Sequence, residues 1–330
     1  MALNKAQIEN VKILKQIRRN LHDKKRECMV DGCKENAINS HLLQRHGILN
    51  NIIEDGHMME LRPNDMFKWN REESPIVFKR VGLNDAISYP LFCNHHDTEI
   101  FAEIENSAPD LYSYRTRLLF SYRAICADEY KKRFEAEYFD RIINSRTLDF
   151  DHVYVSKLRD SFYAGVRDLC QFKSVILEEL ASPSHRLEFV HLEFPIFPVY
   201  ASSPFSFETN LNKLNSSEMW DGGVVHLIPL NDKLHILWGY LKDSLNKDME
   251  EYINKWRNVN KESLGVLLTD LFTQRIEIFG MSPSLYRSIN KINIEKYFKS
   301  QLKSYQTYDM NLCVDFNMFE GDVWDNYNLL

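Results

Sequence analysis

The stretch "LFCNHHD", residues 91–97, has one cysteine, two histidines and one aspartate within the five positions 93–97. Upstream, "CMVDGC", residues 28–33, carries two more cysteines around an Asp-Gly turn signal. A C-x4-C pair and a C-x2-H pair, each held in a turn, supply the thiolate and imidazole ligands of a tetrahedral structural zinc site. The pattern therefore predicts a Zn2+ site that decides the fold of the N-terminal part. Its predicted ligands are Cys28, Cys33, Cys93 and His96.

The remaining cysteines and histidines have no such spacing. Cys126, Cys170 and Cys313 lack a cysteine or histidine partner at ligand distance along the chain, and we expect them to be buried free cysteines. Alternative fourth ligands exist, and they are His41, His46, His57 and His95. His96 is favoured because its spacing from Cys93 lets both side chains reach one ion from a single turn.

The composition indicates an ordered, soluble protein. The chain has 330 residues, 44% of them hydrophobic and 27% charged, with only 11 glycines and 10 prolines, which argues against disorder. No apolar run reaches the roughly 18 residues of a membrane span, and the N-terminus lacks the pattern of a signal peptide. We therefore expect a cytoplasmic protein with no membrane association. Its 6 cysteines are then expected to be thiols or metal ligands.

The distribution of charge is uneven. The net charge is −6, yet the segment before the first cysteine is strongly basic. Such a local patch favours contact with phosphate, although a solvated helix face explains the same residues. The predicted nucleic-acid-binding residues are Lys12, Lys15, Arg18, Arg19, Lys24, Lys25 and Arg26.

Hydrophobic periodicity predicts mixed secondary structure in the first third of the chain. Residues 5–26 have apolar positions at helical spacing and predict an amphipathic helix. Short strands are expected at 37–43, 57–61 and 76–82, and a helix is expected directly after residues 91–97. The predicted domain built from these elements covers residues 1–107, a basic helix followed by a zinc domain.

The rest of the chain, residues 108–330, is predicted to be a second domain of the α+β class. Two long helices, one starting near Pro109-Asp110 and one over residues 151–182, should form an antiparallel pair. Residues 185–208 and 222–241 predict antiparallel strands with a turn at Asn231-Asp232, and residues 243–298 predict helices. Trp220, Trp238 and Tyr240 could line a binding surface, with core packing as the simpler role.

The N-terminal motifs resemble those of the zinc-stabilised HNH endonuclease family. The similarity covers about residues 25–106 and is carried by C-x4-C, then "AINSH", then "FCNHHDTEIFAEIE". The resemblance implies a treble-clef, ββα-metal fold in which a zinc knuckle brackets the active site. It assigns the first-strand histidine to His41 and the metal-binding helix residue to Asp97. The group with this extended pattern is bacterial.

The resemblance also implies a mechanism for hydrolysing a phosphodiester. His41 would be the general base, and Asp97 would hold Mg2+ or Mn2+ against the scissile phosphate. The sequence departs from the family at Ser40, where an acidic residue or histidine usually stands. Ser40 or a backbone carbonyl is a candidate to complete the shell through water. The middle asparagine is open among Asn84, Asp85 and Ser88.

These observations favour a metal-dependent HNH-like endonuclease that acts on nucleic acid, preferably DNA, and that serves in bacterial antiviral defence by analogy with other small two-domain nucleases. The C-terminal domain would sense a signal, form homo-oligomers or bind a protein partner. The alternative is a catalytically inactive zinc-finger module that binds nucleic acid or a protein, which Ser40 favours. Residues beyond 107 contain no further catalytic motif.

Overall fold

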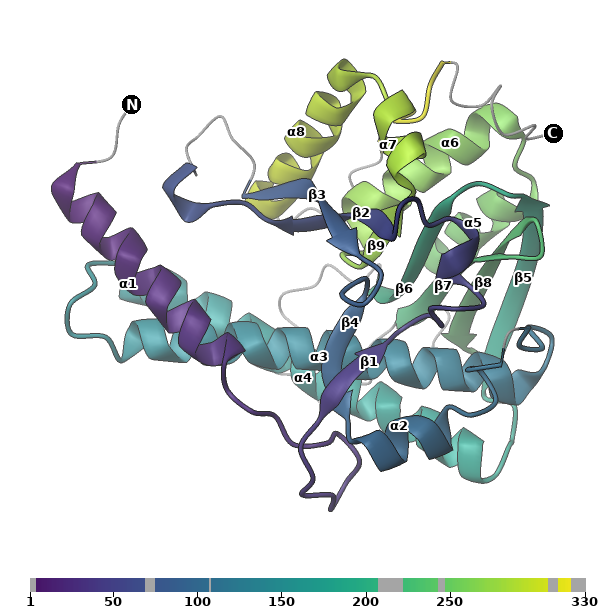
Figure 1. Ribbon diagram of the computed structural model, residues 1–330, viewed down its shortest axis with the longest axis horizontal. Coiled ribbons are helices and arrows are strands. Elements are labelled where there is room, and N and C mark those ends of the chain that lie inside the picture. The colour runs from purple at the N-terminus through teal and green to yellow at the C-terminus, as the bar shows by residue number, and fades with distance from the viewer. Residues whose placement is uncertain are drawn as a thin grey trace.

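The computed structural model describes residues 4–68, 75–106, 108–206, 222–242, 247–307 and 314–321, and it mixes helices and sheets as predicted for an α+β protein (Figure 1). The helices are α1 (Lys5–His22), α2 (Asn94–Ile100), α3 (Tyr114–Ile143), α4 (His152–Ala181), α5 (Lys247–Arg257), α6 (Lys261–Asp270), α7 (Pro283–Ser288) and α8 (Lys291–Thr307). The strands are β1 (Ile38–His41), β2 (His57–Pro63), β3 (Ile76–Gly82), β4 (Ser88–Phe92), β5 (Leu187–Pro195), β6 (Val199–Ser206), β7 (Gly222–Leu230), β8 (Lys233–Leu241) and β9 (Phe279–Met281). Short helical turns occur at η1 (Leu49–Asn51), η2 (Met66–Lys68) and η5 (Leu271–Arg275). No helix in these ranges is long and apolar enough to cross a membrane.

The strands form two antiparallel sheets. A seven-stranded sheet has the order β3-β2-β9-β6-β7-β8-β5, and a separate ribbon pairs β1 with β4. The β7–β8 hairpin turns at Asn231 and Asp232, whose φ angles are +52° and +58°. Positive φ at both central residues is the geometry of a tight hairpin turn and suits Asn and Asp. The predicted turn is therefore confirmed.

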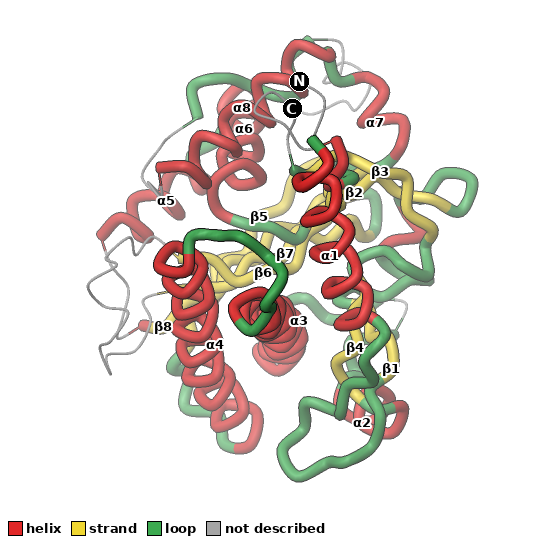
Figure 2. The backbone as a smooth tube through the Cα atoms, turned by 90° about the vertical axis from the view of Figure 1, so that its left-hand side faces the viewer, coloured by secondary structure: helices red, strands yellow, loops and turns green. Residues whose placement is uncertain are grey.

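Helices lie on both sides of the large sheet (Figure 2), and each face of the sheet contributes to a different hydrophobic core. Helices α3 and α4 cover one face, where Leu118 and Leu119 pack with strand residues such as Val224. Helices α5, α6 and α8 cover the other face, where Trp238 packs against Trp256. Since strand side chains alternate between faces, the nearly uniform burial of β7 and β8 follows from this two-sided cover.

Helices α3 and α4 are the predicted antiparallel pair. Contacts such as Lys173 with Glu129 and Tyr163 with Asp140 run in opposite directions along the two helices. Helix α3 begins later than predicted, because Ser113 caps it by accepting a hydrogen bond from the Thr116 amide.

Several details differ from the predictions. The first helix ends at His22 rather than near residue 26. Residues 243–298 are not all helical, since β9 lies within them. Trp238 and Tyr240 are buried at 0% and 5% exposure and belong to the core. Trp220 and Cys313 lie outside the described residues.

Strand β9 connects strands from the first and second parts of the chain. It pairs with β2 on one side and with β6 on the other. The hairpin of β2 and β3 therefore extends a sheet whose other strands come from the second half of the chain. The hydrogen bond from the Tyr200 hydroxyl on β6 to the buried carboxylate of Glu60 on β2 adds a side-chain link.

Gly280 on β9 is required by this close approach. A Cβ atom added there would lie 2.3 Å from both Cζ and the hydroxyl of Tyr200, which is fully buried. Gly280→Ala should therefore lower the free energy of unfolding by about 1–3 kcal/mol through overpacking. Denaturant unfolding measures the change. Gly82→Ala is the control, since its added Cβ meets its nearest atom only at 4.0 Å, and an equal effect of both variants would contradict the argument.

Candidate metal centre

The four predicted zinc ligands converge in the structure. The ligand atoms of Cys28, Cys33, Cys93 and His96 all lie within 4.8 Å of one another. The His96 Nδ1 atom lies 3.4 Å from the Sγ of Cys28 and 3.3 Å from that of Cys93. The Sγ atoms of Cys33 and Cys93 are 4.0 Å apart. Tetrahedral Zn2+ requires S···N and S···S separations of about 3.6 Å and about 3.8 Å, so this cluster has the geometry to bind a metal such as zinc.

Local backbone geometry brings the two ligand pairs together. Gly32 has a φ of +80° within the Cys28–Cys33 turn, a conformation that glycine adopts without strain. The Met29 amide donates to the Leu91 carbonyl at 2.8 Å, so this turn is tied directly to β4. Cys93 is the N-cap residue of α2, which places His96 in the first helical turn beside it.

The thiols of Cys93 and Cys28 have opposite pKa shifts. The backbone N–H of His96 points at Cys93 and lowers the pKa of that thiol, which favours the thiolate that a metal requires. Burial raises the pKa of Cys28, so a cation is needed to stabilise its thiolate form.

The alternative histidines lie elsewhere. His95 forms an exposed pair with Glu99 at 3.1 Å, and His57 is bonded to the Asp55 carbonyl. His46 is exposed, and His41 lies on β1 with a different partner. Among these candidates His96 is the one that reaches the cysteines.

His41 is oriented by the loop that precedes β4. Its Nε2 lies 3.1 Å from the carbonyl oxygen of Asn84. A carbonyl only accepts, so Nε2 carries the proton and the neutral ring keeps its lone pair on Nδ1. Burial lowers the pKa of His41, and the positive charges of Arg45 and Arg123 lower it further. The imidazole is therefore neutral, with a basic nitrogen, at pH 7.

Asn84 contacts two residues of the candidate site. Its carbonyl accepts from His41, and its side-chain Oδ1 accepts from Arg45 at 2.8 Å. Ser88 pairs with His41 across the ribbon, but its hydroxyl is directed to the Asn84 carbonyl at 3.4 Å. The backbone carbonyl of Asp85 accepts a hydrogen bond from Arg62. Among the three residues left open by the sequence, Asn84 makes the direct contact with His41.

Asp97 follows His96 on α2 and pairs with Arg123. The distance from Asp97 Oδ1 to Arg123 Nη2 is 3.6 Å. Arg123 comes from α3, is completely buried, and also donates to Glu105 at 2.6 Å. Its guanidinium lies 4.0 Å from the centre of the Phe101 ring. The carboxylate of Asp97 is thus already facing one cation, with which a divalent ion would compete.

Ser40 does not share a face with His41. Neighbouring residues of a strand point to opposite sides, and Ser40 is fully buried whereas His41 is partly exposed. Among the described residues, the Ser40 hydroxyl has no hydrogen-bond partner. Ser40 is therefore poorly placed to complete a metal shell beside His41.

Many of the predicted nucleic-acid-binding residues are engaged by carboxylates. Arg18 binds Glu135, while Lys24 and Arg26 both bind Glu137 at 3.1 and 2.6 Å. Lys15 pairs with Asp65, and Lys12 has a weak contact with Glu9. Within the described part of the chain, neither Arg19 nor Lys25 has a carboxylate at ion-pair distance. Much of the basic charge of α1 and the residues after it thus serves to pack this segment on α3.

One further cluster of ligand-type residues was missed by sequence reasoning. His191 and Glu193 on β5 meet His235 on β8, with their ligand atoms within 4.8 Å. The His191 Nε2 and His235 Nδ1 atoms are 3.0 Å apart. Only the β5–β8 register brings Glu193 opposite His235, and spacing along the chain carries no signal for it.

The polar groups of this second cluster already have partners. The His235 Nε2 atom is bonded to the Leu230 carbonyl, and Arg117 lies 3.4 Å from the His191 Nδ1 atom. Glu193 accepts from Lys233 and from the Tyr112 hydroxyl. Two cations flank the cluster and each imidazole has its hydrogen-bond partners, so the arrangement is explained as a closed polar network.

Comparison with known proteins gives no match: no family model, curated protein or solved structure matches the chain. The chemical assignments therefore depend on the geometry of the residues themselves.

Removal of one cluster ligand tests the metal centre. We expect about one metal ion per chain in the wild type. Cys93→Ser should abolish this metal binding and lower the melting temperature, because a structural metal stabilises the fold that binds it. Elemental analysis and thermal unfolding measure these changes. Cys170→Ser is the control, since Cys170 lies on α4 outside the cluster, and it should retain the metal. Unchanged metal content in Cys93→Ser would contradict the assignment.

Proposed function

We propose that this protein is an HNH-like, metal-dependent endonuclease that hydrolyses phosphodiester bonds of nucleic acid, with DNA as the favoured substrate. The observation that carries the proposal is the setting of His41. It lies on β1 of a ribbon next to a Cys3His cluster, with Nε2 bound to Asn84 and Nδ1 left as the basic nitrogen. Together β1, β4 and α2 supply the two strands and one helix that a ββα-metal unit requires.

In this proposal the Cys3His cluster binds a structural Zn2+ in a treble-clef arrangement. Four protein ligands leave no open coordination position, which suits a structural ion rather than a catalytic one. The ion would join the Cys28–Cys33 turn to the start of α2. It would thereby fix β1, which follows the turn, relative to Asp97, which follows His96.

His41 would accept the proton of the attacking water at Nδ1. A general base must be unprotonated at the working pH, and the environment of His41 lowers its pKa. The bond to Asn84 fixes the tautomer and the ring orientation. Arg45, held by the Asn84 side chain, adds positive charge near the position where a phosphate would approach.

Asp97 is the proposed ligand of a catalytic Mg2+ or Mn2+. Such an ion is typically held by one or two carboxylates together with waters and substrate phosphates, so a single carboxylate meets the requirement. When bound, the ion would stabilise the charge that develops on the phosphate. Glu105 is already bonded to Arg123, so the buried guanidinium keeps a counterion when Asp97 turns to another cation.

A second candidate function is a non-catalytic zinc module that binds nucleic acid or a protein partner. Two observations favour it. Asp97 faces the buried cation Arg123 at 3.6 Å, and Ser40 is buried away from His41. In either case the second half of the chain would sense a signal, oligomerise or bind a partner, and a role in antiviral defence rests on analogy with other two-domain nucleases.

A cleavage assay separates the two functions. Purified protein is incubated with plasmid DNA or RNA and Mg2+ or Mn2+. Loss of a general base typically costs 10²–10⁴ in rate, so His41→Ala should lower cleavage by roughly 100-fold or more. Asp97→Ala should also lower cleavage strongly, because it removes the ligand of the ion that stabilises the charge on the phosphate. Both variants should retain the Cys3His-bound metal. His46→Ala, at an exposed position, is the matched control. Full activity of His41→Ala would refute its role as base, and an inactive wild type would favour the non-catalytic module.

The pH dependence of cleavage gives an independent test. The base works only when neutral, and its folded pKa lies below the ordinary 6.5. Activity should therefore persist through pH 6.5 and fall only when the pH drops through the lowered pKa. Arg45→Gln removes a nearby positive charge and should move this acid limb to higher pH. Arg45→Lys keeps the charge and should leave the limb at the pH of the wild type. The profile of kcat/KM against pH measures the limb, and a limb unmoved in Arg45→Gln would contradict the role of this charge.

A further inference from the structure

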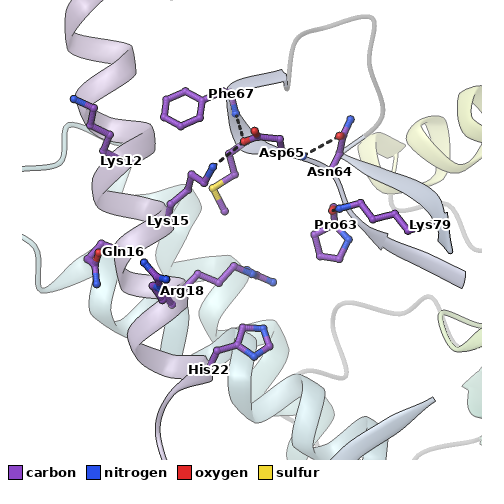
Figure 3. A pocket seen from close by; sticks show the side chains of 12 residues that line it. Lys12, Lys15, Gln16, Arg18, His22, Pro63, Asn64, Asp65, Phe67 and Lys79 are labelled. Atoms are coloured by element: carbon purple, nitrogen blue, oxygen red, sulfur yellow. Dashed lines mark hydrogen bonds and ion pairs between the residues drawn. The ribbon is translucent and has the colours of Figure 1, made fainter. Parts of the chain in front are cut away.

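A basic groove lies between α1 and the segment formed by the end of β2 and the η2 turn that follows it, and Lys79 of β3 also lines it (Figure 3). Its volume is about 750 Å³. Helix α1 contributes one wall, and the opposite wall carries Phe67 and Lys79. The cations that line it are Lys12, Lys15, Arg18, Arg19 and Lys79.

The groove has an excess of positive charge. Asp65 is the single acidic residue among its described lining residues, and Lys15 neutralises it at 2.9 Å. Arg18 is directed to Glu135 on α3. The remaining cations are Lys12, Arg19 and Lys79. The contact of Lys12 with Glu9 is exposed on both sides and 3.4 Å long, which makes it weak.

Lys79 is the residue that sequence reasoning did not assign. Its ammonium donates to the Pro63 carbonyl at 2.6 Å, so the group is held at the groove wall, and no carboxylate of the described residues lies at ion-pair distance from it. It stands across the groove from α1. Positive charge on both walls suits a linear polyanion that passes between them.

The groove also has one partly exposed aromatic ring, that of Phe67. Phe67 is 39% exposed, although the Lys15 ammonium lies 4.6 Å from its ring centre. Large exposed aromatic rings beside a basic groove are typical of sites where unpaired bases stack. A duplex keeps its bases stacked inside, so this surface favours a single strand.

The groove continues toward the β1–β4 ribbon. A neighbouring cavity of about 960 Å³ shares Arg18, His22 and Pro63 with it and extends to Asn39 and Ser88 on the β1–β4 ribbon. Ser88 is the residue paired with His41, and Asn39 lies on the same face of β1 as His41. The cavity therefore reaches the ribbon that carries His41, although His41 and Asp97 are not among its described lining residues.

We propose that this groove binds a single-stranded segment of nucleic acid, with phosphates held by Lys12, Arg19 and Lys79 and a base against Phe67. The inference rests on the proposed function, because it supplies the substrate path of that same site. The proposal assigns fewer phosphate contacts than the sequence predicted, because Arg18, Lys24 and Arg26 form ion pairs with Glu135 and Glu137.

Fluorescence anisotropy with a labelled 20-nucleotide single strand tests the groove. The full-length His41→Ala protein is the background, so that binding is measured without cleavage. Arg19→Glu together with Lys79→Glu should weaken binding by roughly ten-fold or more and reduce the salt dependence. Lys247→Glu together with Lys255→Glu on α5 makes a charge change of the same size outside the groove and should have little effect.

Asp65→Asn should change the affinity for the single strand in the opposite direction. It removes the one negative charge of the described lining while keeping the side-chain acceptor for the Phe67 amide, so binding should become several-fold tighter. A purely structural role of these residues would not produce tighter binding. Unchanged binding in both groove variants, or tighter binding of the duplex than of the single strand, would overturn the proposal. Groove-dependent binding without any cleavage by the wild type would instead refute the nuclease alone.

Discussion

Strand β9 is the constraint on which the arrangement of this molecule depends. It is three residues long, yet it pairs with β2 on one side and β6 on the other. Without β9 the β2–β3 hairpin would not be hydrogen-bonded to the rest of the seven-stranded sheet. The side of the groove that this hairpin forms would then no longer be fixed relative to α1. The middle residue, Gly280, permits the Tyr200 ring to pass over the strand and reach Glu60. A buried carboxylate, a buried hydroxyl and a glycine thus act together at the junction.

Arg123 makes a second connection, between the candidate metal centre and the long helix α3. A buried guanidinium requires compensation, and it receives that from Glu105, from Asp97 and from the Phe101 ring. These partners lie on or just after α2, which begins at the Cys93 cap. The charge of α3 therefore orients the same helix that the Cys3His cluster anchors at its other end.

The parts of the structure that could be predicted from sequence are those encoded locally. The Cys28–Cys33 turn and the Cys93–His96 step each depend on a few adjacent residues, so their spacing was sufficient to predict the cluster. The Asn231-Asp232 hairpin was equally local. Strand β9 could not be recognised, because three residues give no periodicity and its partners lie far away in the sequence. The same holds for the contact of Asn84 with His41, which depends on how a loop folds back on β1.

Charge illustrates the same limit. The basic character of residues 5–26 was evident, but whether each cation faces solvent or a carboxylate depends on helix α3, more than a hundred positions later. Glu135 and Glu137 neutralise the part of this segment that packs on α3, whereas the groove side retains Lys12 and Arg19 and gains Lys79 from β3. One short segment thus has two roles, and its composition alone does not show which cations belong to which role. Its inner face stabilises the fold by ion pairs that are partly shielded from solvent, and its outer face keeps the charge that a phosphate chain would require.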